Sequence, residues 1–286
     1  EIASGKRLGG EKEEDIYNIL GMVMPPPEIR EDKGEIELAV QGIIPELVGY
    51  DDIKGDFHMH TTYSDGKASL RQMVQTCYEL GYKYIVISDH TKSLRVAGGL
   101  DEAGFRTQWK EIEQVQKEYK DMTILRGCEV DILEDGSLDL PDSFLEEFDY
   151  VIASIHSHMS PNTDNTKRIL KACHNKYVNQ IGHPTGKNYG YRDGYILNME
   201  EVIKAALDTN TALELNIPRA DLSPDNIRLA VERGVMISIV TDSHSSSHLQ
   251  FMKVGVGLAR RGWALKERVL NTKPLEEVRA FVRRKR

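Results

Sequence analysis

The nine residues YKYIVISDH, Tyr82–His90, join an uninterrupted apolar run to an aspartate and a histidine. Uninterrupted apolar and β-branched residues are typical of a strand that is covered on both faces, as in a parallel sheet. Six more runs of this kind occur along the chain: GDFHMH (55–60), TILRGCEV (123–130), YVIASIH (150–156), VNQIGH (178–183), ALELN (212–216) and VMISIVTDSH (235–244). The sequence therefore predicts seven buried strands.

Helix-like segments lie between these runs, at 70–80, 104–120, 165–176, 199–208, 224–233 and 247–261. Buried strands that alternate with helices form βα units around a parallel sheet. Seven such units within about 190 residues favour a closed α/β barrel over a doubly wound sheet.

The first 54 residues follow a different pattern. They contain one amphipathic helix signal at 13–20 and then the segment MPPPEIRED, in which three prolines prevent a helix from continuing. We interpret residues 1–54 as the end of a preceding domain with a linker, and residues 55–286 as the barrel domain. Because the first residue is Glu1 rather than methionine, we expect the chain to be an excised part of a longer protein.

The composition narrows the class of protein. The chain has 286 residues, of which 40% are hydrophobic and 29% charged, as in globular proteins. No apolar run is long enough for a membrane span, and no signal peptide opens the sequence. Three widely spaced cysteines are typical of reduced thiols in a cytoplasmic protein. The net charge of −8 argues against a broadly basic nucleic-acid-binding surface, but not against a local one.

Side chains of the metal-binding type follow six of the seven predicted strands. Barrel enzymes gather their active site at the carboxyl ends of the strands, and six of the nine histidines fall at such ends. A single histidine there is more often a core residue with a hydrogen-bond partner, whereas the whole set indicates a metal site. The candidate ligands are His58, His60, Asp65, His90, Glu129, His156, His183, Asp242 and His244.

This donor set indicates a reaction class. Imidazoles and carboxylates suit zinc, manganese or iron, and nine donors suffice for two or three ions. Six neutral histidines, three carboxylates and three divalent ions would give a site charge of about +3, which favours an anionic substrate such as a phosphate ester. We therefore expect phosphoester hydrolysis by a metal-bound hydroxide held by Glu129, Asp242 and His60.

The motifs HMHTTYSDG, SDH, GCEVDI, SIHSH, IGHP and TDSH resemble, in order and spacing, those of PHP (polymerase and histidinol phosphatase) domains. The resemblance implies a distorted seven-stranded (β/α)7 barrel of the TIM type with three divalent ions, which are Mn²⁺, Zn²⁺ or both. It also implies that His58, His60, Glu129 and Asp242 hold one ion. Glu129 would bridge to a second ion on His156 and His183, and the third would lie on Asp65, His90 and His244.

Other segments narrow the resemblance to the carboxyl-terminal PHP domain of bacterial and archaeal family X DNA polymerases: KSLRVAGGLDE, HPTGKNYGYRDGY, HLQFMKVGVGLARRGW and VLNTKPLEEV. The opening GKRLGGEKEEDIYNILGMVMPPPEIRED is similar to the end of that family's thumb subdomain. The segment ELNIPRADLS departs from the family because it is shorter than usual, which leaves the roles of Asn216, Arg219 and Asp221 open.

Basic and polar residues near the strand ends are candidate substrate contacts, because barrel enzymes bind substrate with the loops that follow their strands. His158 is expected on the strand face of His156, and His248 at the start of the last helix. The candidates are Lys92, Arg95, His158, Lys187, Arg192, Arg219 and His248. Each of the five lysines and arginines alone is more often a plain solvated charge, whereas as a group they could hold a DNA backbone. For His158 a structural role is equally consistent with the sequence.

The resemblance implies a 3′→5′ exonuclease that acts on DNA ends, with 3′-end cleaning and abasic-site cleavage as related activities, beside an upstream polymerase domain. Two alternatives use the same fold: a small-molecule phosphatase of the histidinol phosphatase type, and a non-catalytic scaffold for a polymerase. A hydrolase of the amidohydrolase type shares the HxH motif and the late aspartate, but a lysine ligand after the fourth strand is missing.

Overall fold

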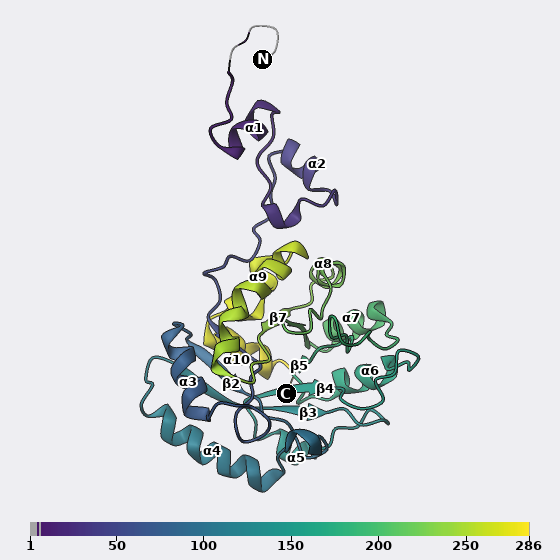
Figure 1. Cartoon of the computed structure of the whole chain (residues 1–286). Helices are drawn as coiled ribbons and strands as arrows, with labels where there is room; N and C mark the ends of the chain where they lie inside the picture. Colours follow the sequence, from purple (N-terminus) through teal and green to yellow (C-terminus); the bar gives the residue numbers. More distant parts are fainter. Residues whose placement is uncertain (1–4, 6, 286) are drawn as a thin grey trace.

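The computed structural model describes residue 5 and residues 7–285 and shows a barrel with helices on its outside (Figure 1). Seven strands pair in parallel and in sequence order. They are β1 (Gly55–Asp56), β2 (Tyr84–Ile87), β3 (Thr123–Asp131), β4 (Tyr150–Ser154), β5 (Gln180–Ile181), β6 (Ala212–Asn216) and β7 (Ile237–Val240). The predicted seven-stranded α/β barrel is confirmed.

A helix follows most of the strands and packs on the outside of the barrel. These helices are α3 (Leu70–Glu79), α4 (Glu102–Gln116), α5 (Asp142–Leu145), α6 (Thr166–His174), α7 (Met199–Asp208), α8 (Pro224–Glu232) and α9 (Met252–Arg261). The predicted helix at 247–261 is two elements, because a 3-10 helix, η3 (Ser246–Phe251), precedes α9. The short helix α5 was not predicted.

Several strands are shorter than their apolar runs. β1 and β5 have two residues each, although runs of six residues were expected. The backbone turns out of the sheet at His183 and Asp242, whose φ angles are +26° and +45°, in a region that non-glycine residues seldom adopt. The strand-end histidines and aspartates therefore lie on irregular segments beyond the sheet.

The inside of the barrel changes character along the strands. Near the amino ends, Tyr84, Val86, Tyr150 and Ile152 form an apolar inner cluster with Phe57. Side chains two residues apart share a face of a strand, so the inner face of β3 runs from Leu125 to Glu129, and His90 and His156 lie on the segments just beyond β2 and β4. The apolar residues fill one end of the barrel and the polar donors the other.

Helix α10 (Leu275–Arg283), which was not predicted, packs Val278, Phe281 and Val282 into the inner cluster. Because this cluster belongs to the amino ends of the strands, α10 closes that end. The carboxyl ends remain the open side of the barrel.

The first and last strands are joined by little backbone pairing. One parallel bridge connects Met59 to Ser243, beyond the ends of β1 and β7. Below it, the Asn271 side chain, which is 0% exposed, donates from Nδ2 to the carbonyls of Gly55 (2.9 Å) and Ile239 (2.8 Å). Its Oδ1 accepts from the Ile239 amide at 2.8 Å. An asparagine side chain thus completes the ladder where the two strands do not meet.

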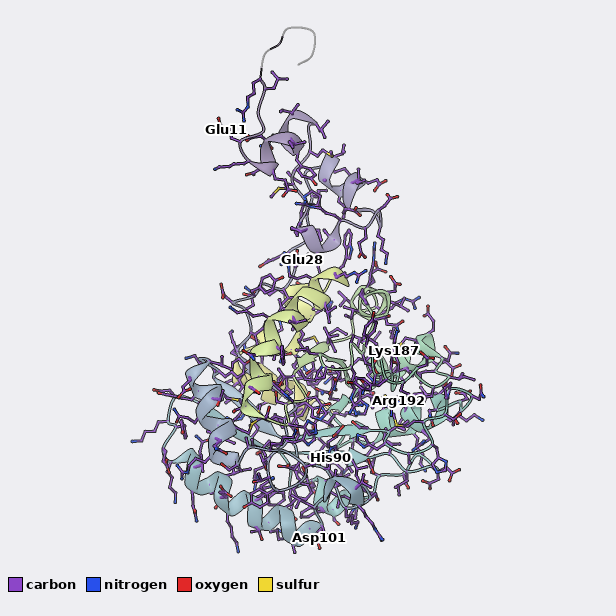
Figure 2. The ribbon with its side chains drawn as sticks, viewed as in Figure 1. Glu11, Glu28, His90, Asp101, Lys187 and Arg192 are labelled. Carbon is purple, nitrogen blue, oxygen red and sulfur yellow. The ribbon has the colours of Figure 1, made fainter. Side chains whose placement is uncertain are left out.

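The amino-terminal segment contains the helices α1 (Glu13–Ile19) and α2 (Glu35–Val40) and extends away from the barrel beyond α9 (Figure 1). It is attached near Glu28, whose carboxylate lies 2.8 Å from the Arg260 guanidinium of α9 (Figure 2). Ile29 packs with Leu47 and Trp263 beside this ion pair. The division of the chain at residues 54 and 55, and the assignment of the first part to a polymerase thumb, stay predictions. Within residues 5 and 7–285, every helix is too short or too polar to span a bilayer.

We predict that Asn271→Ala destabilises the barrel by about 3 kcal/mol, because it leaves buried backbone groups of both edge strands without partners. The free energy of unfolding in urea measures this loss. Asn162→Ala, at an exposed position, is the control and should change the free energy by less than about 0.5 kcal/mol. Equal effects of the two substitutions would show that Asn271 does not close the barrel.

Candidate metal centre

The nine predicted ligands converge at the carboxyl ends of the strands. His58, His60, His90, Glu129, His183 and Asp242 are at most 5% exposed, whereas Asp65 and His244 lie nearer the surface. His90 lies within the body of the barrel in Figure 2. Segments that are more than 180 residues apart in the sequence thus supply donors to one buried cluster.

Four donor atoms form the deepest group. His58 Nε2 lies 3.1 Å from His60 Nε2, 3.3 Å from Glu129 Oε2 and 3.7 Å from Asp242 Oδ1. His60 Nε2 lies 3.5 Å from the same Glu129 oxygen and 3.1 Å from the same Asp242 oxygen. Donors about 2.1 Å from a tetrahedral ion are about 3.4 Å from each other. The separations among His58, His60 and Glu129 therefore fit a single ion, and the Asp242 oxygen lies beside the two imidazoles.

The second Glu129 oxygen faces two more imidazoles. Oε1 lies 3.0 Å from His183 Nε2 and 3.3 Å from His156 Nε2. Several donors of the cluster, among them His156 Nε2 and Asp242 Oδ1, are buried without a hydrogen-bond partner. Buried polar atoms are rarely left unpaired, and atoms that face a common point without bonding to one another are typical of ligands of one ion.

A third group lies closer to the surface. Asp65 Oδ1 is 3.3 Å from His244 Nε2 and 3.7 Å from His90 Nε2. The His60 ring stacks between the rings of His90 and His244, with centroid distances of 4.2 and 4.3 Å. Because His90 Nδ1 is also 2.9 Å from Glu129 Oε2, His60 and His90 each border two groups. The division of the donors among three ions stays a prediction.

The electrostatics differ from one donor to the next. Burial alone would raise the pKa of Glu129, but the imidazoles of His58, His156 and His90 hold it well below its usual value. Burial and the neighbouring His90 lower the pKa of His60 to about 3, and burial with Arg219 lowers that of His183 to about 4. Burial also disfavours the charged forms of His58 and His156, but neighbouring carboxylates raise the pKa of His58 well above its usual value and that of His156 to about 10. Ionised carboxylates and neutral imidazoles are the forms that bind divalent metals.

Two carboxylates that the sequence interpretation missed orient the histidines. Glu214, which is 0% exposed on β6, accepts from His58 Nδ1 at 2.8 Å, and Asp131 on β3 accepts from His156 Nδ1 at 2.5 Å. Carboxylates of this kind fix the tautomer and the ring orientation of a metal-binding histidine. A glutamate inside the apolar run ALELN, and an aspartate two residues after Glu129, were signals in the sequence.

Glu214 accepts on both oxygens. Besides His58, the Gln180 amide donates to Oε2 at 2.5 Å, and the His183 backbone amide (3.1 Å) and the Asn216 side chain (2.8 Å) donate to Oε1. All four partners donate to Glu214, so the site specifically accommodates a carboxylate. Asn216 also donates to Asp242 Oδ2 at 3.0 Å and so links Glu214 to a second predicted ligand.

The segment that carries Asp65 is held by Asp89. This buried aspartate points away from its neighbour His90 and accepts from the Thr61 amide (2.8 Å), the Ser64 hydroxyl (2.5 Å) and Gln108 (2.6 Å). Asp89 therefore positions a loop and is not part of the donor cluster.

The candidate substrate contacts differ in their distance from the donors. Arg219 lies beside the cluster, with Nε 3.4 Å from Asp242 Oδ2 and 19% of its side chain exposed. Arg192 is partly buried and donates to the Gly186 carbonyl at 3.0 Å. Lys92, Arg95 and Lys187 are exposed on the loops after β2 and β5. Figure 2 shows Lys187 and Arg192 near each other on the same loop.

The expectation for His158 was wrong in its geometry. β4 ends at Ser154, and His158 lies in a turn with a φ of +54°, so it does not share a strand face with His156. Its half-exposed ring is 3.5 Å from Glu134 Oε2. His248 lies in η3, as expected near the start of the last helical segment. Substrate contact by either residue stays a prediction.

The family model that matches residues 56–216 is the PHP domain. The chain is 44% identical over 275 residues to the DNA polymerase/3′-5′ exonuclease PolX of Bacillus subtilis, which covers 95% of this chain and 48% of that protein. The chain thus spans about half the length of that relative. It is also 31% identical over 204 residues to a probable phosphatase of Clostridium acetobutylicum, with 67% of this chain and 79% of that protein covered.

Two solved structures share the fold. Histidinol phosphate phosphatase from Lactococcus lactis, complexed with zinc, L-histidinol and phosphate, aligns with a TM-score of 0.54 and 21% identity over 74% of this chain and 94% of that one. A putative histidinol phosphatase from Listeria monocytogenes aligns with a TM-score of 0.57 and 17% identity over 68% and 97% of the two chains.

We predict that Glu214→Gln weakens divalent metal binding about tenfold or more, because the amide nitrogen of glutamine cannot accept the hydrogen bonds that Glu214 accepts. Competition with a chromophoric chelator measures the affinity. Glu200→Gln, on the exposed face of α7, is the control with the same chemical change. Unchanged affinity in Glu214→Gln would show that this carboxylate does not orient a ligand.

Proposed function

The chain belongs to the PHP domain family of metal-dependent phosphoesterases, and from this premise we propose that it is a phosphodiesterase that removes nucleotides from the 3′ ends of DNA. The observation that carries the hydrolytic part is the group of donor atoms on His58, His60 and Glu129, whose spacing suits one ion, with Asp242 beside His60. The identity of 44% to a protein named as a 3′-5′ exonuclease supports the choice of substrate.

The residues of the cluster have separate tasks in this proposal. The donor groups would hold two or three divalent ions, manganese or zinc, which supply an activated water and neutralise phosphate charge. Glu214 and Asp131 keep two of the donor imidazoles in position. In the hydrolysis, water adds to phosphorus, the bond from phosphorus to the leaving sugar oxygen breaks, and that oxygen takes up a proton.

Arg219 is placed to orient the phosphate. Burial lowers its pKa and the Asp242 carboxylate raises it, with a net rise, so the guanidinium keeps its charge. Its Nε faces Asp242, and an arginine presents further N–H donors in a planar fork that matches phosphate oxygens. We propose that these remaining donors bind the phosphate to be cleaved, while Lys92, Arg95, Lys187, Arg192, His158 and His248 contact the strand farther out.

A polymerase domain on the same longer chain belongs to the same proposal. The Bacillus subtilis relative is named as both a polymerase and an exonuclease, and the chain matches about half of it. A 3′ end shortened here would then be extended by the polymerase. The resemblance of residues 5–32 to the end of a thumb subdomain supports this arrangement.

A phosphatase that acts on small phosphate esters is the second candidate. The probable phosphatases of Clostridium acetobutylicum and a Thermoanaerobacter strain match over 79% and 89% of their own lengths, so the chain covers those proteins more fully than it covers PolX. The donor cluster serves either substrate. A non-catalytic scaffold is disfavoured, because all nine donor positions carry a competent ligand.

We predict that the chain shortens a 5′-labelled single-stranded oligonucleotide in Mn²⁺, and that Asp242→Ala lowers the rate at least about a hundredfold by removing a charged donor from the cluster. Denaturing gel electrophoresis measures the products. Asp208→Ala, at an exposed position on α7, should keep the full rate. Efficient turnover of histidinol phosphate with an intact oligonucleotide would favour the phosphatase instead.

We predict that Lys92→Ala combined with Lys187→Ala raises the KM for DNA, because phosphate contacts from both loops are lost. The slope of log Kd against the logarithm of the salt concentration should become smaller by about one to two. Fluorescence anisotropy at several salt concentrations measures this slope. Lys204→Ala, on α7, is the control, and an unchanged slope in the double variant would place the DNA elsewhere.

A further inference from the structure

A tight turn after β5 carries two strongly exposed aromatic rings. Asn188 and Arg192 exchange backbone hydrogen bonds of 2.9 Å in each direction, and Gly190 between them has a φ of +79°, which glycine adopts without strain. Tyr189 and Tyr191 are 72% and 90% exposed. We call residues 186–193 the tyrosine turn.

These two rings are the most exposed aromatic side chains among the described residues, and the next most exposed ones, on Tyr50 and Phe251, are 45% exposed. Burial of an aromatic ring in a contact is more favourable than burial of most other side chains, because the ring removes a large apolar area from water. Two such rings on one short turn are typical of a surface that binds a partner.

The tyrosine turn is anchored next to the donor cluster. The Tyr189 amide donates to the Arg219 carbonyl at 3.1 Å, and Arg219 Nε is 3.4 Å from Asp242 Oδ2. At the base of the turn, the Tyr195 hydroxyl donates to the Pro184 carbonyl at 2.8 Å, next to His183. One residue, Arg219, therefore separates the exposed rings from a predicted metal ligand.

Basic side chains surround the rings. Lys187 Nζ lies 5.9 Å from the centre of the Tyr189 ring. Arg192 lies close enough to Arg219 that burial and this second guanidinium lower the pKa of Arg192. Aromatic rings combined with cationic side chains are the arrangement with which proteins hold single-stranded nucleic acid, because bases stack on the rings and phosphates pair with the cations.

We propose that Tyr189 and Tyr191 form a stacking surface for the bases next to the cleaved phosphate of single-stranded DNA. This inference rests on the proposed function and deepens it: the donor cluster and Arg219 bind one phosphate, whereas the tyrosine turn selects a strand over a small phosphate ester. Stacking does not distinguish among bases. The surface therefore favours single-stranded DNA over small phosphate esters, whatever the base sequence of the DNA.

Two oligo-dT ligands with hydrolysis-resistant phosphorothioate linkages at the 3′ end test the proposal. They have the same length and charge, but in one of them tetrahydrofuran abasic residues replace the last three nucleotides. Wild-type protein loaded with Mn²⁺ should bind the normal ligand about tenfold or more tighter than the abasic one, as measured by fluorescence anisotropy. Tyr189→Ala combined with Tyr191→Ala should abolish this ratio, and Tyr189→Phe combined with Tyr191→Phe should preserve it.

Competition for Mn²⁺ with a chromophoric chelator, applied to the same variants, reports on the metal centre separately. The Mn²⁺ affinity should stay within about twofold of wild type in both double variants, because the tyrosine side chains are outside the donor cluster. If wild-type protein binds the two ligands equally, or the alanine variant loses affinity for both equally, the proposal is overturned. If wild-type protein prefers bases but leaves unmodified DNA intact, the stacking surface stands and the proposed nuclease function fails.

Discussion

The Glu129 carboxylate, 1% exposed at the centre of the barrel, is the constraint on which the rest of the site depends. A charge that is removed from water costs several kcal/mol unless other charges compensate it. Five imidazoles surround this carboxylate at distances between 2.9 and 3.5 Å: His58, His60, His90, His156 and His183. Imidazoles that bind a metal are neutral and do not compensate the charge, so this compensation falls to the ions proposed for the centre.

The parallel barrel is the means by which such a centre is built. All seven strands end at the same side of the barrel. A few donor residues after each of several strands are therefore enough to bring nine donors together. Glu129 pairs in register with Ile152 and bridges to His90, which fixes its height relative to the neighbouring strands. The opposite end of the barrel is filled by α10 and closed by Asn271. Packing and chemistry are thereby separated along the barrel axis.

The sequence was sufficient for the parts that depend on periodicity. Uninterrupted apolar runs predicted the seven strands, and β6 at 212–216 was predicted without error. The nine donors could be selected because they follow these runs. What could not be predicted depends on tertiary contacts. Asn271 acts on two strands that are far from it in the sequence, and the apolar face of α10 resembles that of any surface helix until its position at the barrel end is known.

The orienting residues were missed for a related reason. Glu214 lies in a run that reads as a strand of the core, and only the folded structure shows that His58 is its partner. His158 shows the opposite error. The spacing of two residues in SIHSH suggested a shared strand face, but the strand ends before it and the backbone turns at His158. The alternation of faces holds only within a strand, and the end of a strand is set by backbone pairing with its neighbours.

The acidic net charge and an anionic substrate are compatible because charge acts locally. At physiological ionic strength the interaction between exposed charges is screened beyond about 8 Å, so most of the carboxylates on the outer helices have little effect at the open end of the barrel. There, Arg219 lies beside the donor cluster, Arg192 lies near Arg219, and Lys187 lies on the same turn as Arg192. A chain with a net charge of −8 can thus present a positive surface at the place where the proposed DNA strand would enter. Because low-dielectric walls strengthen the field inside a buried site, ions in the donor cluster would outweigh the distant acidic residues in their effect on a phosphate.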